Sequence, residues 1–171
     1  MLSMKPFLII NVVLFQTCWL VAAFYPEYAA LVITALLLLH FGITPTRRLD
    51  FKILLMGLLG CVIDQTLISF NVINVEQSTI PLWLVTLWLF LSVCLNHSLA
   101  WLARFRTWQV AILGSVFGTL SYVAALNIGA FTTPLPFYQF VIIEILVWFL
   151  LLPIMIKFKR VIHSPKKVTY E

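Results

Sequence analysis

Four ionisable side chains lie within long apolar stretches of this sequence, and they have the clearest potential for chemistry. They are His40, Asp64, His97 and Glu144. A titratable group in such a stretch is energetically costly, so it is normally paired or functional. Imidazole and carboxyl groups can transfer protons or hold a polar ligand by hydrogen bonds. We therefore take these four residues as the first candidates for a site.

Asp64 is the deepest of these residues and is a candidate catalytic group. On a helix it shares one face with Gly57, Gly60 and Asn71, so we expect it to face another helix rather than lipid. Glu144 lies at a similar depth in the last apolar stretch, and two such carboxyls could share a proton. Proton or cation coupling and general acid–base catalysis are the functional interpretations. A structural hydrogen bond between helices is the alternative.

Hydroxyl and amide groups accompany the two carboxyls. Gln16, Ser121 and Tyr122 are the partners to which Asp64 could donate or from which it could accept. We also expect Ser121, Tyr122 and Glu144 to contact a substrate or ligand.

A second polar layer is expected near one membrane surface. His97, the second candidate catalytic residue, follows Asn96 and precedes Arg104 by seven positions, which places them on one face of a continuous helix. His40 and Asn11 have similar predicted depths. Asn96 and Arg104 are the candidate ligands for a lipid headgroup, with His97 as acid or base. The alternative is that each histidine is a satisfied side chain at the interface.

Other chemistries have little support in the sequence. There is no HExxH motif and no pair of histidines at helical spacing, so we expect no metal site and no other cofactor. Cys18, Cys61 and Cys94 are interpreted as small apolar side chains. The net charge of +5 is explained by basic residues beside a membrane, and we expect no nucleic-acid partner.

Six apolar segments of membrane-spanning length must position these residues. A helix needs about 20 mainly apolar residues to cross a bilayer, and 63% of this chain is hydrophobic. The sequence therefore predicts an all-α polytopic membrane protein with six transmembrane helices. The predicted segments are 6–24, 28–44, 52–73, 81–103, 109–131 and 137–156.

The positive charges predict how the chain is oriented. All eleven Lys and Arg residues fall at the N-terminus, in alternate gaps and in the C-terminal tail, whereas the other gaps carry only Glu27 and Glu76. By the positive-inside rule, both termini are cytoplasmic. We expect one transmembrane domain over residues 1–156 and a basic cytoplasmic tail over 157–171 that lies on anionic headgroups.

Gly114 and Gly118 form a GxxxG motif in the fifth segment, and Ser121, Ala125 and Gly129 continue the same ridge. Small residues at this spacing let two helices approach closely. Packing within the chain is one interpretation, and contact with a second copy or a partner subunit is the other.

Several local motifs resemble a family of small proteobacterial inner-membrane proteins with a domain of unknown function. The similarity implies a bacterial inner-membrane location and marks Asp64, Asn96, His97, Ser121 and Tyr122, but not Glu144. It also implies a link to fatty-acid modification, which favours a lipid ligand, and it supplies no activity. The motifs are Gly60–Asp64, Pro81–Leu84, Trp88–Phe90, Leu95–Leu99, Trp101–Leu102, Gly114–Tyr122 and the early Phe15, Gln16 and Trp19.

Three functional hypotheses follow. The leading one is a protein that binds or modifies a membrane lipid at the inner leaflet, with binding and catalysis both open. The second is a small proton- or ion-coupled transporter or channel that uses Asp64 and Glu144. The third is an accessory subunit that holds partner helices through Gly114 and Gly118.

Overall fold

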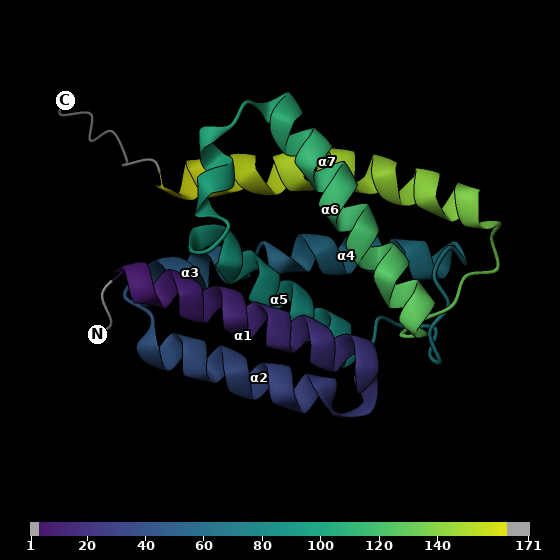
Figure 1. Ribbon diagram of the computed structural model, residues 1–171, viewed down its shortest axis with the longest axis horizontal. Helices are drawn as coiled ribbons and strands as arrows, with labels where there is room; N and C mark the ends of the chain where they lie inside the picture. The colour runs from purple at the N-terminus through teal and green to yellow at the C-terminus, as the bar shows by residue number, and fades with distance from the viewer. Residues whose placement is uncertain (1–3, 164–171) are drawn as a thin grey trace, which may run out of the picture.

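The computed structural model describes residues 4–163, and this part of the chain is built from helices (Figure 1). Its only β-type pairing is an isolated bridge between Asn74 and Thr132, which joins two loops. The predicted all-α class is confirmed. The helices are α1 (Met4–Phe24), α2 (Pro26–Ile43), α3 (Arg47–Leu54), α4 (Gly57–Ser69), α5 (Leu82–Asn96), the 3₁₀ helix η1 (Ala100–Arg104), α6 (Thr107–Ile128) and α7 (Phe137–His163).

Five helical stretches in the described part are long and apolar enough to span a membrane, which confirms a polytopic membrane protein. The shorter α5 is also apolar. Within hydrocarbon, a helix satisfies its backbone hydrogen bonds internally, so apolar stretches of this length fold as helices. The five stretches are Pro6–Phe24, Pro26–Ile43, Arg47–Ser69, Thr107–Ile128 and Phe137–Ile162.

Two of the six predicted segments contain an irregularity: Arg47–Ser69 is one apolar helical stretch with a turn inside it, and the helix expected over 81–103 was wrong beyond Asn96. The first divides into α3 and α4 at a turn over Leu55 and Met56. The second stops at Asn96, because His97 leaves the helical region with φ −122° and ψ −97°. The backbone N–H of Ser98, freed at this break, donates to the Asn11 side chain of α1 at 3.2 Å. Irregular backbone at membrane depth is tolerated when protein groups satisfy it in this way.

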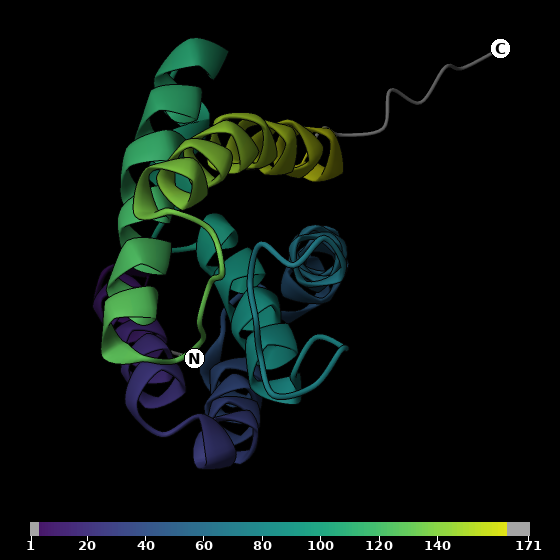
Figure 2. The same cartoon turned by 90° about the vertical axis from the view of Figure 1, so that its right-hand side faces the viewer.

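The helices form two packed groups (Figures 1 and 2). In one group, α1, α2 and α5 lie side by side, and α3 and α4 pack on α5. In the other, α6 crosses α7 and packs on it, which is the most extensive helix contact in the described chain. Because α6 has only limited contact with α1 and less with α5, an apolar groove lies between the two groups.

Glycines set the close approaches between helices. Gly114 lies against the Trp148 backbone carbonyl and Leu152, and Gly118 lies under the Trp148 ring, so this ridge of α6 packs on α7 of the same chain. Gly60 of α4 likewise lies against the ring of Trp88. Gly114 and Gly118, which were also candidates for contact with a second subunit, therefore pack against α7 of the same chain.

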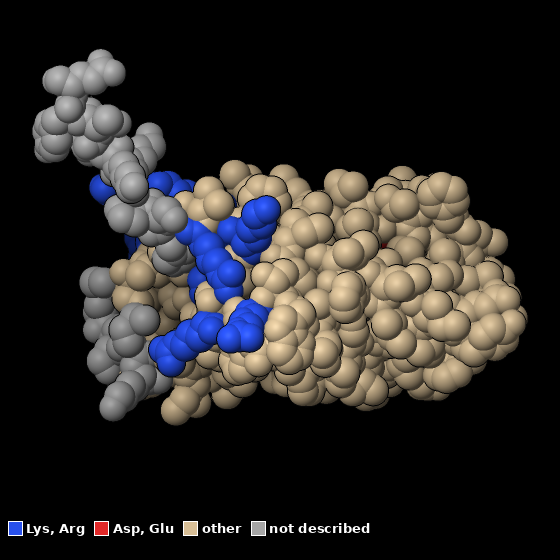
Figure 3. Space-filling model, turned by 90° about the horizontal axis from the view of Figure 1, so that it is seen from above, with Lys and Arg blue, Asp and Glu red and all other residues tan. Residues whose placement is uncertain are grey.

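Basic side chains gather at one end of the molecule (Figure 3), whereas Glu27 lies in the first turn of α2 and Glu76 in the loop after α4, both at the opposite helix ends. The final helix α7 continues through residue 163, so the first part of the predicted basic tail is helical. Residues 164–171, which include Lys166 and Lys167, lie outside the described part. The described basic residues at or beside these helix ends are Arg47, Arg48, Lys52, Arg104, Arg106, Lys157, Lys159 and Arg160.

Candidate functional site

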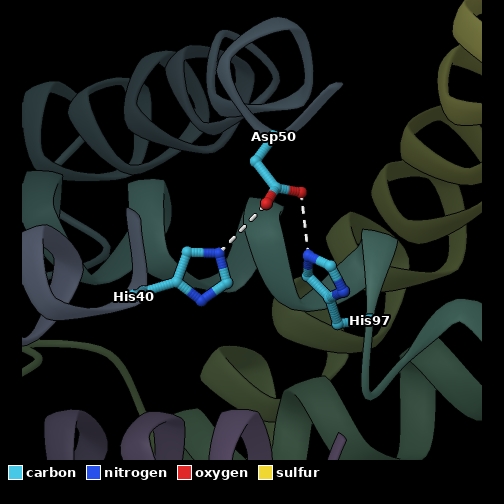
Figure 4. Close-up of side chains that lie close together, drawn as sticks. All are labelled: His40, Asp50 and His97. Carbon is cyan, nitrogen blue, oxygen red and sulfur yellow. Dashed lines mark hydrogen bonds and ion pairs between the residues drawn. The ribbon is translucent and has the colours of Figure 1, made fainter. Parts of the chain in front are cut away.

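A carboxylate between two imidazoles is the centre of the first buried polar cluster (Figure 4). Oδ1 of Asp50 lies 2.8 Å from Nε2 of His97, and its Oδ2 lies 3.3 Å from Nε2 of His40. Asp50 is in the first turn of α3, His40 is in the last turn of α2, and His97 caps α5. Their exposed fractions are 0%, 0% and 2%. Because α5 ends at Asn96, the His97 ring can reach the Asp50 carboxylate of α3.

Three more side chains donate to the same carboxylate. Thr44 donates at 2.5 Å, Asn96 at 2.6 Å and Thr46 at 3.3 Å. With the two imidazoles, Asp50 therefore has five hydrogen-bonding partners, which fill the roughly four lone-pair sites of its two oxygens. We call His40, Thr44, Thr46, Asp50, Asn96 and His97 the Asp50 cluster.

The α1 helix closes the Asp50 cluster from the side. Asn11 is fully buried, and its Nδ2 lies 3.5 Å from Nδ1 of His40. Phe7, also fully buried, meets the His97 ring edge-on with centroids 4.7 Å apart. Nδ1 of His97 is buried and has no hydrogen-bond partner among the described residues. Thus both histidines present Nε2 to Asp50, and their second nitrogens differ in environment.

A second buried cluster surrounds Asp64. Its carboxylate accepts a hydrogen bond from the Trp88 indole at 2.5 Å, and the Tyr122 hydroxyl lies 2.7 and 2.8 Å from its two oxygens. These side chains come from α4, α5 and α6, so the cluster ties the two helix groups together. Of the three partners considered for Asp64, Tyr122 makes the contact, whereas Ser121 accepts from the Trp19 indole at 2.8 Å.

Glu144 of α7 is fully buried near this second cluster. Its two carboxyl oxygens have no hydrogen-bond partner in the described structure. Glu144 is close enough to Asp64 and Tyr122 for their charges to interact. No hydrogen bond joins the two carboxyls here, so they do not form a directly bonded pair.

An apolar groove of about 620 Å³ lies between α1, α5 and α6. This volume is within the range of roughly 300–1,000 Å³ that is typical of small-molecule sites. Aromatic and aliphatic side chains form most of its wall, and the few polar groups on it include Gln16, Ser121 and Tyr122. The Asp64 cluster reaches this groove through Tyr122 and Trp88, which both line it.

The predicted site residues therefore do not form one site, and they lie in the Asp50 cluster, in or near the Asp64 cluster, and on η1. Asp64 and His97 belong to different clusters, and Asn96 joins His97 on Asp50. The expected common face of His97 and Arg104 was wrong, because the helix ends at Asn96 and Arg104 is an exposed residue of η1. Asn71 does not share the face of Asp64 either, since it follows the end of α4 and is exposed.

Sequence reasoning missed Asp50, the centre of the first cluster, together with Thr44 and Thr46. In the sequence, Asp50 lies in a gap between two apolar segments, among the basic residues Arg47, Arg48 and Lys52. An acidic side chain in such a gap is normally exposed to solvent. The one distinguishing signal of Asp50 is that it is the sole acidic residue in that basic gap.

One protein-family model matches a region of the chain that contains both clusters. The family model described as "Protein of unknown function (DUF2878)" matches residues 8–154. The chain belongs to this family. The match runs from α1 into α7, so the matched region of this chain contains the Asp50 cluster, the Asp64 cluster and the groove. No curated protein and no solved structure gives a significant match to the sequence. Membership of a family of unknown function, expected from the local motifs, is confirmed, and it supplies no activity.

Proposed function

We propose that this membrane protein binds a lipid, with the apolar part of the lipid in the groove between α1, α5 and α6. The groove itself carries this proposal, because it combines about 620 Å³ of volume with an almost entirely apolar wall. A soluble polar substrate would gain little from such a wall, whereas an acyl chain already dissolved in the bilayer matches it.

The shape of the groove also favours a long ligand. Its wall follows α6 from Leu113 to Ala125, which is about 18 Å at 1.5 Å per residue. Side chains from η1, such as Leu102, line one end, and Phe131 lines the other. Ser121 and Tyr122 supply hydroxyl groups beside this path, so we assign them to contact a polar atom of the lipid.

This position differs from the headgroup site first expected at His97, Asn96 and Arg104. The His97 ring is closed in by Asp50 and Phe7, and Arg104 does not join it. The groove is therefore the better location for the lipid. Any chemical modification of the lipid would involve the Asp64 cluster, because its Tyr122 borders the groove.

The test is mass spectrometry of lipids that remain with the protein after purification in mild detergent. Ala124 lines the groove on α6, so Ala124→Trp should fill part of it and lower the bound lipid several-fold. Ala35→Trp is the matched control, because Ala35 is exposed on α2 and does not line the groove. The proposal fails if wild type retains no lipid above the detergent background, or if both variants retain the wild-type amount.

One observation favours a second candidate, a proton- or ion-coupled transporter. Glu144 is a fully buried carboxyl without a hydrogen bond, and it lies near the buried Asp64. Intramembrane carboxyls of this kind occur in proton and ion pathways. In proteoliposomes, Asp64→Asn should then abolish a pH-dependent flux that the wild type carries. The same flux in both proteins, or none in the wild type, would count against transport.

A further inference from the structure

We infer that His40, Asp50 and His97 form a binding site for a divalent transition-metal ion. The possible ligand atoms of these three residues all lie within 4.8 Å of one another. Two imidazoles and one carboxylate are a ligand set used for zinc and non-haem iron, with other coordination positions left open. This inference concerns the Asp50 cluster, so it does not depend on lipid binding in the groove.

The distances are close to those a metal would require. Bonds of about 2.1 Å at tetrahedral angles put neighbouring ligand atoms about 3.4 Å apart. The nitrogen–oxygen distances from Asp50 are 2.8 Å to His97 and 3.3 Å to His40. These two distances reach different oxygens of Asp50, and all the ligand atoms lie within 4.8 Å of one another, so side-chain shifts of roughly 0.5–1 Å, which are within ordinary motion, would bring the set to metal-binding distances. Both rings already direct Nε2 toward the shared centre (Figure 4).

The three ligands are held in place by packing before any ion arrives. His40 packs edge-on against Phe90 at 5.9 Å and against His97 at 5.3 Å, and Phe7 covers both imidazoles. The three ligands come from three elements: His40 from α2, Asp50 from α3 and His97 from the end of α5. For this reason no metal-binding motif with a fixed spacing appears in the sequence. Such pre-organisation by packed neighbours is what an accurate metal site needs.

Charge also favours a cation. With neutral imidazoles the three ligands carry one negative charge, and all are buried. Arg47, the nearest basic residue in sequence to Thr46, directs its guanidinium to the Phe41 and Gly42 carbonyls rather than to Asp50. Thr44 and Thr46 place hydroxyl oxygens 3.4 and 3.5 Å from Nε2 of His97, where they could add oxygen ligands or orient a metal-bound water.

Asn11 supplies the second layer around the site. Histidines that bind metals normally hold their other ring nitrogen with a hydrogen bond, which fixes the ring and the proton position. In the structure, Asn11 accepts from the Ser98 N–H with Oδ1 and offers Nδ2 to His40 Nδ1. Metal binding at Nε2 moves the His40 proton to Nδ1, so the Asn11 amide must turn its Oδ1 toward His40 to accept it and gives up the hydrogen bond from the Ser98 N–H. Replacing Asn11 should therefore weaken metal binding without removing a ligand.

The experiment measures metal in the full-length protein, purified in detergent from medium supplemented with zinc, iron and manganese. Elemental analysis by mass spectrometry should find about one equivalent per wild-type chain. His40→Gln, His97→Gln and Asp50→Asn should each lose it, whereas Glu76→Gln, a change of an exposed acid to its amide, should retain it. Asn11→Leu should reduce affinity by about 10- to 100-fold.

Wild type alone provides the second measurement, because a ligand variant could fail to fold. After chelation it is titrated with Co²⁺, whose visible absorption bands report nitrogen and oxygen coordination. Saturation at one Co²⁺ per chain, with Zn²⁺ displacing it, supports the site. Less than a tenth of an equivalent in the purified protein together with no Co²⁺ band overturns the inference. Full metal retention by folded His40→Gln and His97→Gln overturns the assignment of the ligands.

Discussion

Replacing Gly60 by alanine is expected to destabilise the protein, because the new methyl group would overlap the six-membered ring of Trp88. The ring must retreat by more than about 1 Å to restore a carbon–carbon contact near 3.5 Å. Its indole donates to Asp64 at 2.5 Å and stacks on Trp148 with centroids 5.5 Å apart, so it cannot move freely.

The magnitude follows from three effects. Overpacking of a closely packed interior costs about 1–3 kcal/mol. Weakening the Trp88–Asp64 hydrogen bond adds about 1 kcal/mol. The better helix propensity of alanine returns up to about 1 kcal/mol. We therefore expect Gly60→Ala to lower the free energy of unfolding by about 1–4 kcal/mol.

Gly42→Ala is the matched control, since a methyl group at Gly42 would meet no atom within 4 Å. The assay is reversible unfolding in mixed detergent micelles, followed by tryptophan fluorescence. The control should be neutral or gain up to about 1 kcal/mol, because only the helix propensity changes there. In a Trp88→Leu background, Gly60→Ala should cost less than in the wild type, because the overlapping ring is gone. Equal stability of the Gly60 and Gly42 variants would refute the packing argument.

Three further changes test other parts of the structure by the same unfolding assay. Tyr122→Phe removes a donor from the buried Asp64 carboxyl and should cost about 1–3 kcal/mol, and an unchanged stability would show that the bond contributes nothing. Glu144→Gln should be neutral or stabilising, because that buried carboxyl has no hydrogen bond, so a loss above roughly 1 kcal/mol would contradict its described surroundings. Gly129→Ala should cost about 1 kcal/mol, because Gly129 ends α6 with φ +90°, and an unaltered midpoint would argue against that conformation.

The all-α membrane class could be predicted from the sequence, because the bilayer core permits few backbone structures. A chain with apolar segments of about 20 residues must satisfy its backbone hydrogen bonds as helices, so the helices and most of their ends could be predicted. The polar character of Asp64 and its contact with Tyr122 could also be anticipated, since a buried carboxyl needs a donor on a neighbouring helix.

Breaks in the helices were not predictable from apolar length. The segment around His97 has no glycine or proline to announce an interruption, and its residues fit a helix by composition. The helix ends there because Asn11 binds the freed backbone of Ser98 and Asp50 binds the His97 ring. Both partners are distant in sequence, so the local pattern contains no trace of them.

The sequence by itself thus determined the membrane class, the number of apolar segments and the asymmetric placement of positive charge, all of which depend on the solvent and on local composition. Only the tertiary structure decided that Asp50, apparently a surface acid among arginines, is buried between His40 and His97. It also decided that Asp64 and His97 belong to separate clusters. These pairings depend on which helices touch, and a linear pattern of polar and apolar residues does not encode that neighbourhood.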